Sequence, residues 1–205
     1  MRALLKRFID IAGAIVGLFL CAPLFAIVAI AVRIEDKGPV LFAQWRLGRR
    51  GEPFRCLKFR TMRMDAEDTL RRWEEQNTPQ WQAYLAGNRK LRDDPRVTRI
   101  GRVLRTTSLD EIPQLINVLR GEMSLVGPRP LLSRELADYG TDALRLYEQV
   151  RPGLTGLWQV SGRSGLSMQQ RATLDAQYVR QQSIALDFAI LARTLPAVLR
   201  RQGAY

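Results

Sequence analysis

The hydrophobic pattern divides the chain near residue 32. Residues 8–32 form an apolar run in which Asp10 is the single charged side chain, and three basic residues precede it. As a straight helix this run would measure about 37 Å, enough to cross a hydrocarbon core of about 30 Å. From residue 33 onwards, polar and apolar positions mix as they do in a soluble domain. We therefore expect a membrane helix at residues 1–36 and a globular domain at residues 37–205.

Three arrangements of the apolar run compete: a spanning helix, a cleaved signal peptide and a re-entrant hairpin. A signal peptide fits poorly because the run is too long, although Ala29 and Ala31 offer a cleavage pair. A span would separate three basic residues from nine that follow between residues 33 and 63, whereas basic flanks stay cytoplasmic. Pro23 lies mid-run, where it removes a backbone hydrogen bond and kinks a helix. Because spanning helices tolerate proline, span and hairpin both stay open on these grounds.

The globular part predicts a mainly helical α+β domain. Two alternating segments, residues 40–44 and 54–59, predict strands joined by a basic turn. Apolar residues recur with helical spacing over residues 110–119, and Gly121 ends that helix. The other predicted elements are a polar helical stretch at 65–85 broken near Pro79, a short strand at 123–130 ending in a proline-rich turn, a glycine-rich loop at 151–165, and a helix at 167–182.

The last segment, residues 184–201, predicts an amphipathic helix that Pro196 should bend. Such a helix either packs on the core or lies in the lipid interface. Its expected apolar face consists of Phe188, Leu191, Leu195, Val198 and Leu199, and the charged residues expected to lie away from that face are Asp187, Arg193, Arg200 and Arg201.

The composition narrows the chemistry. The chain has 28 Arg and 4 Lys against 20 acidic residues, a net charge of +12, and no histidine. Imidazole catalysis is therefore excluded, and the charge favours nucleic acid, an anionic membrane or a phosphorylated substrate as partner. Cys21 and Cys56 are isolated in the sequence, which favours a reducing compartment.

Asp110 and Glu111 are the strongest candidates for catalysis. Pro113 belongs in the first turn of the predicted helix, which places both acids at the helix N-terminus. Ser108 and Glu111 also match a capping box, so a purely structural role competes. The surroundings favour chemistry: Arg105 closes an arginine-rich run upstream, and Arg129 lies between two prolines downstream. Adjacent carboxylates in such a phosphate-binding region indicate Mg²⁺ and a nucleophilic aspartate.

A second basic candidate lies on the predicted strand at residues 54–59. Lys58 and Arg60 alternate with Leu57 and Phe59, so we expect both cations on one face of the strand. They would bind substrate phosphate there, or else form the solvated edge of a sheet.

In these residues the sequence resembles the bacterial sugar transferases, the small monotopic polyprenyl-phosphate phosphoglycosyl transferases. The resemblance extends from about residue 4 to residue 199, and its ordered series of motifs is highly specific. The motifs occupy residues 6–10, 38–42, 58–62, 94–101, 107–115, 117–119, 123–130 and 151–160.

The resemblance implies roles for individual residues. It implies a re-entrant helix broken at Pro23, with Ala22 where the family often has serine. It implies Asp110 as nucleophile and Glu111, with Asp110, as the Mg²⁺ site. Lys58, Arg105 and Arg129 fall on family positions near the phosphates, and we add Arg60 from its predicted place on the strand.

The activity implied is transfer of a sugar 1-phosphate from a UDP-sugar to polyprenyl phosphate, which releases UMP and begins a polysaccharide or glycoconjugate. The membrane partner implies the bacterial cytoplasmic membrane with the catalytic domain on its cytosolic face. A homo-oligomer is compatible with the sequence, and no motif specifies the sugar. The alternative is a non-catalytic membrane-tethered protein, either a scaffold or a nucleic-acid-binding protein. The hypothesis of a nucleic-acid-binding protein is disfavoured because aromatic residues are not interspersed among the basic residues of the arginine-rich run.

Overall fold

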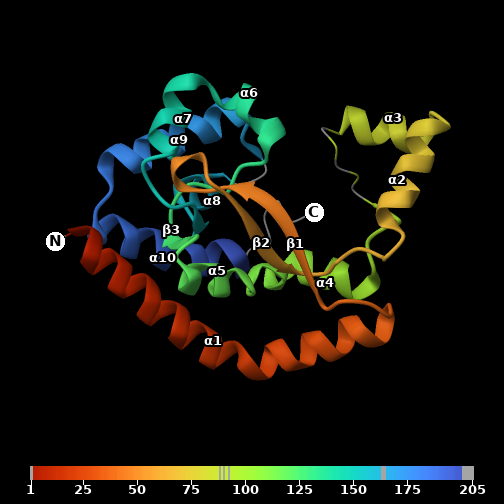
Figure 1. The fold of residues 1–205 in the computed structure, drawn as a ribbon, viewed down its shortest axis with the longest axis horizontal. Coiled ribbons are helices and arrows are strands. Elements are labelled where there is room, and N and C mark those ends of the chain that lie inside the picture. Colours follow the sequence, from red (N-terminus) through yellow and green to blue (C-terminus); the bar gives the residue numbers. More distant parts are fainter. Residues whose placement is uncertain (1, 88, 90, 92, 163–164, 200–205) are drawn as a thin grey trace.

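The computed structural model describes residues 2–87, 89, 91, 93–162 and 165–199. Within these ranges helices make up most of the fold, and the strands pair in two small two-stranded sheets (Figure 1). The predicted mainly helical α+β class is therefore confirmed.

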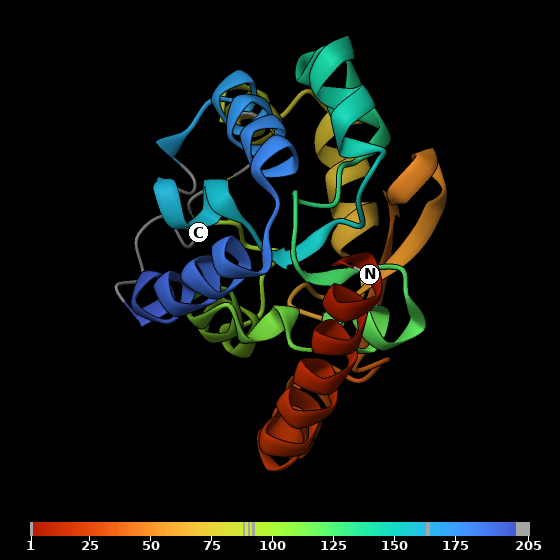
Figure 2. The ribbon, with the colours of Figure 1, turned by 90° about the vertical axis from the view of Figure 1, so that its left-hand side faces the viewer.

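Helix α1 (Arg2–Glu35) lies along the outer edge of the molecule in both ribbon views (Figures 1 and 2). By length and composition it is apolar enough to cross a membrane, and only 11% of its most apolar 18-residue stretch is buried in the protein. Pro23 lies inside the helix and is exposed, and Figure 1 shows α1 bent into a shallow V. The expected break is thus a bend, because the residues around proline keep helical geometry although one hydrogen bond is lost.

Strands β1 (Leu41–Leu47) and β2 (Pro53–Phe59) form the predicted antiparallel hairpin, with the 3-10 turn η1 (Arg49–Gly51) at its tip. Cys56 is buried against α1 and α5, and Phe59 is buried against the second half of α1. The ring centroids of Phe59 and Phe25 lie 4.6 Å apart. The hairpin therefore packs directly on the apolar helix.

Helices α2 (Ala66–Glu75) and α3 (Pro79–Ala86) form the predicted polar pair and extend to one side of the body (Figure 1). Arg96 connects this arm to the core. Its guanidinium lies 5.1 Å from the ring centroid of Trp73 and 5.2 Å from that of Tyr84. It also forms a buried ion pair of 2.6 Å with Asp94.

Helix α4 (Arg99–Thr107), the 3-10 turn η2 (Leu109–Glu111) and helix α5 (Gln114–Arg120) follow one another above α1 (Figure 1). Ser108 ends α4 in the left-handed conformation, with φ of 58°. This conformation is costly for a residue with a side chain, and it turns the chain sharply into η2. The segment presents Asp110 and Glu111 between two helices.

Strands β3 (Ser124–Val126) and β4 (Gly153–Thr155) pair in parallel, and β4 is followed by helix α8 (Leu157–Ser161). The glycine-rich segment 151–165 is therefore in part regular structure, and the prediction of a loop was wrong. A Cβ atom on Gly153 would lie 2.1 Å from the backbone nitrogen of Gly127. The glycines here allow two backbones to approach closely, which composition alone does not distinguish from flexibility.

A further lobe contains the turn η3 (Ser133–Glu135), helices α6 (Leu136–Tyr139) and α7 (Thr141–Tyr147), and the predicted helix α9 (Met168–Gln181). Leu131, Tyr139, Tyr147 and Ala172 form its buried core. Ser167 caps α9 by accepting a hydrogen bond from the backbone N–H of Gln170.

Helix α10 (Ile184–Leu199) confirms the last predicted element, but Asp187 was expected away from its packed face and is buried. Its carboxylate accepts hydrogen bonds from Lys6 and from the hydroxyl of Tyr178, each at 2.7 Å. The helical pattern could not reveal these partners because they come from other elements. Phe188 is 56% exposed. The side chains of Leu195, Val198 and Leu199, and residues 200 and 201, lie outside the described part of the chain.

Candidate active site

The structure brings Lys58 of β2 to the two carboxylates of η2. The Lys58 ammonium lies 2.6 Å from Glu111 Oε1 and 3.5 Å from Asp110 Oδ2. Asn117 of α5 holds the strand in place, since its amide accepts from the backbone N–H of Leu57 and donates to the carbonyl of Arg55. The adjacent residue Lys58 is thereby fixed at the carboxylates.

The capping box that competed with a catalytic role is not formed. Ser108 makes no capping hydrogen bond with its side chain, and the carboxylate of Glu111 is bonded to Lys58 instead. Pro113 immediately precedes α5, so Asp110 and Glu111 lie in the turn before the helix rather than in its first turn. Both acids are directed to a cation and not to the backbone.

The two carboxylates differ in proton affinity. Burial raises the pKa of Asp110, and the nearby Lys58 and Arg105 offset only part of that effect. Burial alone would also raise the pKa of Glu111, but Lys58 and then Arg129 outweigh it and lower this pKa. Burial and the Lys58 cation are thus the two largest influences on the pKa of Asp110, and they act in opposite directions.

Arg105 lies in the last turn of α4 on the Asp110 side of the site. Its Nε donates to the hydroxyl of Thr61 at 2.9 Å. Gly101, one turn earlier in α4, lies so close to Thr61 that a Cβ atom would be 2.1 Å from the Thr61 carbonyl oxygen. This close approach places Arg105 beside the buried carboxylate.

Arg129 lies on the Glu111 side. Its guanidinium is 5.7 Å from the ring centroid of Trp158, and that of Arg171 is 4.9 Å from the same ring. Among the described residues no carboxylate lies within ion-pair distance of Arg129. A guanidinium held by an aromatic face and left without an acidic partner is suited to an anionic ligand.

A small cavity that is open to solvent is lined by Arg129, Lys58 and Glu111. Residues that the sequence did not single out also line it. Gln114 and Gln159 were missed because they carry no charge and lie outside the basic clusters, although both fall within the motifs that carry the resemblance. Arg46 lay within a basic region but was not chosen. Arg46 is buried and donates to the carbonyl of Pro130 at 3.0 Å. Burial first, and then Arg129, lower its pKa.

Arg60 is not among the residues that the structure gathers here. The chain leaves β2 at Phe59, and the buried Arg60 guanidinium binds Asp36 and the carbonyl of Pro39 instead. Lys58 and Arg60 were expected to lie on one face of the strand, but the structure shows their side chains bound to different neighbours. Pro23, the predicted membrane break, lies in the exposed middle of α1.

Buried polar atoms without a hydrogen-bond partner gather next to Arg129. Within the described ranges they are Trp158 Nε1, Gln159 Oε1, Arg171 Nε and Asp175 Oδ1. Burial raises the pKa of Asp175 to about 7, although Tyr139 donates a hydrogen bond of 2.7 Å to it. Unpaired buried polar groups are costly and gather where a ligand or water completes their bonding.

The donor set fits Mg²⁺. Asp110 and Glu111 already converge on one cation, the Lys58 ammonium. No group of three or more metal-ligating acids, cysteines or histidines occurs in the described part of the chain. Mg²⁺ commonly takes one or two protein carboxylates and completes its shell with water and substrate phosphates. Two carboxylates are a number of protein ligands that Mg²⁺ accepts, and any further ligands would have to come from water or from a bound phosphate.

The fold and the site together define a class of protein: a membrane-associated protein whose site contains two adjacent carboxylates surrounded by arginine side chains. The family model described as bacterial sugar transferase matches residues 1–201. The chain belongs to the bacterial sugar transferase family.

Several named relatives align with nearly the whole of this chain. The exopolysaccharide production protein ExoY of Rhizobium meliloti is 45% identical over 200 residues, which cover 98% of this chain and 88% of that protein. The undecaprenyl-phosphate galactose phosphotransferase of Salmonella typhimurium is 45% identical over 201 residues, 98% of this chain but 42% of that longer protein. The UDP-glucose:undecaprenyl-phosphate glucose-1-phosphate transferase of Caulobacter vibrioides is 42% identical over 210 residues, 98% of this chain and 72% of that protein.

Proposed function

We propose that this protein transfers a sugar 1-phosphate from a UDP-sugar to membrane polyprenyl phosphate, yielding polyprenyl-diphospho-sugar and UMP. The reaction would be the first membrane step in the synthesis of a polysaccharide or glycoconjugate. The observation that carries the proposal is the cluster of Lys58, Asp110 and Glu111, with Arg105 and Arg129 on its two sides. The sugars in the relatives' names are galactose and glucose, so these two donors are the first to test.

We expect this cluster to bind the diphosphate of the donor, because the diphosphate is negatively charged and the cluster is rich in cations. Lys58 and the guanidinium of Arg129 line one cavity, and Arg46 adds a third cation to it. An arginine guanidinium donates two parallel hydrogen bonds to a pair of phosphate oxygens, whereas three cations contribute little to the binding of a neutral sugar. Diphosphate binding would also supply the anion that Arg129 lacks among the described residues.

In the first step, an Asp110 carboxylate oxygen attacks the phosphorus that carries the sugar. The bond from that phosphorus to the bridging oxygen breaks, and its electron pair leaves with UMP. In the second step, an oxygen of polyprenyl phosphate attacks the aspartyl-linked phosphorus. The bond to Asp110 then breaks and restores the free carboxylate, so each bond formed is matched by one broken.

Glu111, together with Asp110, would hold Mg²⁺, which supplies neutralisation of the negative charge on phosphate oxygens when bound. Lys58 fixes the two carboxylates at the site and keeps Asp110 more acidic than burial alone would allow. Asp110 must be ionised to attack, so this cation has a direct chemical purpose.

The membrane arrangement that we propose is re-entrant. Both ends of α1 contact the same globular domain: Arg7 binds carbonyls of α5, and Glu35 binds backbone N–H groups of α4. A helix that crossed the bilayer would carry one end away from that domain. The exposed apolar bend at Pro23 would enter the lipid, with residues 37–205 on the cytosolic face of the cytoplasmic membrane. This placement sets the site at the level of the lipid phosphate.

The decisive experiment places the protein in vesicles with polyprenyl phosphate and Mg²⁺ and measures UMP release from UDP-galactose, UDP-glucose and other UDP-sugars. We expect UMP release from at least one donor, and its loss when EDTA removes Mg²⁺. A protein that releases no UMP from any donor contradicts the proposed activity.

The covalent step is tested without lipid acceptor. Donor labelled in the sugar phosphate should leave its label on the peptide that contains Asp110, and polyprenyl phosphate should then remove it. Asp110→Asn is the negative control. Label retained on that variant would show that another residue is the nucleophile.

A further inference from the structure

The two ends of α1 are bonded to the two ends of one continuous segment, residues 99–120, which holds the Asp110–Glu111 turn in its middle. At one end, the Glu35 carboxylate accepts hydrogen bonds from the backbone N–H groups of Arg99 at 2.6 Å and Ile100 at 2.9 Å. At the other end, Arg7 donates to the carbonyls of Val118 at 2.7 Å and Leu119 at 3.0 Å. Figure 1 shows α4 and α5 lying along α1.

The charges at both contacts match the helix ends that they meet. The first N–H groups of a helix are unpaired and carry positive potential, and the last carbonyls carry negative potential. Glu35 therefore meets the positive end of α4, and Arg7 meets the negative end of α5. Thr98 adds a cap within α4 itself, since its hydroxyl accepts from the backbone N–H of Gly101 at 2.9 Å.

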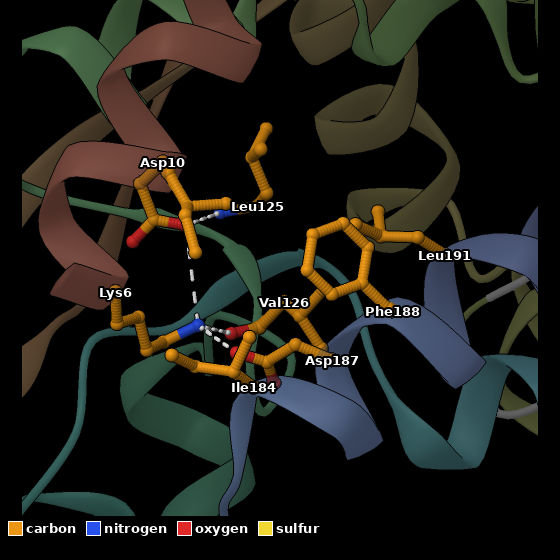
Figure 3. Close-up of a pocket in the computed structure, with 9 residues that line it drawn as sticks. Lys6, Asp10, Leu125, Val126, Ile184, Asp187, Phe188 and Leu191 are labelled. Atoms are coloured by element: carbon orange, nitrogen blue, oxygen red, sulfur yellow. Dashed lines mark hydrogen bonds and ion pairs between the residues drawn. The ribbon is translucent and has the colours of Figure 1, made fainter. Parts of the chain in front are cut away.

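The Arg7 end of α1 is held by several other contacts. Figure 3 shows Lys6 directed to Asp187 and to the carbonyl of Val126, at 2.7 Å and 3.1 Å. Asp10 accepts hydrogen bonds from the Ser124 hydroxyl and from the backbone N–H of Leu125, and it is buried. This end of α1 is thus anchored to β3 and α10 as well as to α5.

At the other end of α1, Glu35 supplies the polar contacts with the segment, two hydrogen bonds as at the Arg7 end. Glu35 is exposed, and Val28 and Val32 supply the buried apolar contacts with Leu104 of α4. The neighbouring Asp36 binds Arg60 and the backbone N–H of Met64, which lie outside α4. Glu35 is therefore the polar link through which α1 holds the start of α4.

We propose that Glu35 is a positioning residue that uses the membrane helix to set α4, and with it Arg105, against the carboxylates. Since α1 is firmly fixed at its Arg7 end, its length and its bend at Pro23 define where Glu35 holds α4. The left-handed Ser108 provides the sharp joint between α4 and the turn. The inference rests on the proposed function for the role of Asp110.

The test compares Glu35→Gln with wild type in the same vesicles, with Glu52→Gln, an exposed acid beside the hairpin tip, as the matched control. We expect kcat for UMP release to fall about 10- to 100-fold in Glu35→Gln, because displacement of a catalytic group by about 1 Å has this effect. The KM for the UDP-sugar should stay within about twofold, since the Arg129 cavity is not altered. Glu52→Gln should match wild type.

A second variant separates positioning from simple capping. Thr98→Asp places a carboxylate at the N-cap of α4 itself, and aspartate caps at least as well as threonine. In Glu35→Gln/Thr98→Asp we expect recovery of the melting temperature, by about 2–4 °C for a chain of this size, without recovery of kcat. Restoration of kcat by Thr98→Asp would overturn the proposal, because α4 would then need only a cap. Wild-type kcat in Glu35→Gln would overturn it as well.

Hydrogen exchange supplies a measurement that does not depend on the reaction. Without any substrate, Glu35→Gln should exchange faster at the backbone amides of Glu111 and Ile112, which bond to Ser108 and Leu109 in wild type. Unchanged exchange there would contradict the link to α1. Faster exchange, in a protein whose wild type releases no UMP, would uphold the link and instead refute the proposed function.

Discussion

The Lys58 ammonium lies 2.6 Å from the Glu111 carboxylate, although the two residues are 53 positions apart in the chain. Packing of α5 against β2 brings them together, and the buried Asn117 joins the two elements by hydrogen bonds to the backbone on either side of Cys56. The backbone on the Lys58 side of the site is therefore held by hydrogen bonds that do not involve a ligand. Rigid placement of charge around a reacting phosphate is a main source of catalytic rate.

We expect the acidic limb of the pH–rate profile to report Asp110. Its pKa is raised, and only the ionised form attacks, so UMP release should fall as the pH drops through a value above the ordinary carboxyl pKa. Lys58→Met removes a cation that lowers this pKa, so the limb should move to higher pH. The rate at neutral pH should fall on the order of 100-fold. Lys37→Met, at an exposed lysine, is the control; an unmoved limb in Lys58→Met would refute the assignment.

Asp110 and Glu111 should have opposite effects on stability. A raised folded-state pKa adds stability below the unfolded pKa, and this is lost as pH rises through the folded pKa. Asp110→Asn should therefore raise the melting temperature at neutral pH, by about 2–4 °C for each kcal/mol, and much less near pH 4. Glu111→Gln should lower it at neutral pH, because the ionised form of Glu111 is favoured in the fold. Calorimetry of both variants checks the two signs, and equal shifts would contradict the assignment.

Arg129 should require its guanidinium shape. Arg129→Lys keeps the charge but loses the paired donors and the guanidinium that lies 5.7 Å from the centroid of the Trp158 ring. Loss of one charge-assisted phosphate contact costs about 1.5–3 kcal/mol, so kcat/KM should fall about 10- to 150-fold. Arg134→Lys, at an exposed arginine of the same segment, is the matched control. Wild-type kinetics in Arg129→Lys would show that the position supplies only diffuse charge.

Because α4 packs closely against Thr61, we expect position 101 to tolerate no residue larger than glycine. In Gly101→Ala the added Cβ would lie 2.1 Å from the Thr61 carbonyl oxygen, so the backbone must shift. Such overpacking costs about 1–3 kcal/mol, and it should also separate Arg105 from the Thr61 hydroxyl. Gly165→Ala, where no atom lies within 4 Å, is the control. A Gly101→Ala variant with wild-type melting temperature and activity would contradict the observed packing.

Pro23 should decide how α1 lies in the membrane. Pro23→Ala restores the missing backbone hydrogen bond and should straighten the helix toward a span. A cysteine at position 3, with Cys21→Ser and Cys56→Ala, would react with a membrane-impermeant thiol reagent only when exposed outside the cell. We expect protection in the otherwise wild-type protein until lysis, and partial labelling in Pro23→Ala. External labelling without the Pro23 change would establish a spanning helix.

Local patterns were sufficient for most of the elements. The hairpin, the pair α2 and α3 on either side of Pro79, and helices α9 and α10 follow from side-chain periodicity, turn residues and caps, which act within a few residues. The segment 151–165 did not follow, because its glycines permit either a loop or a strand. The approach of Gly153 to Gly127 decided between the two.

By itself the sequence determined the apolar helix, the excess of arginine, the absence of imidazole chemistry and the adjacency of Asp110 to Glu111. Only the tertiary structure decided which charges meet. It paired Glu111 with Lys58 instead of with Ser108, directed Arg60 to Asp36, and buried Asp187 against Lys6. The physical reason is the separation along the chain over which each effect acts. Periodicity and capping involve residues that are close neighbours in the chain. An ion pair is set by where packing places two distant segments, and burial then determines how strongly each charge is held.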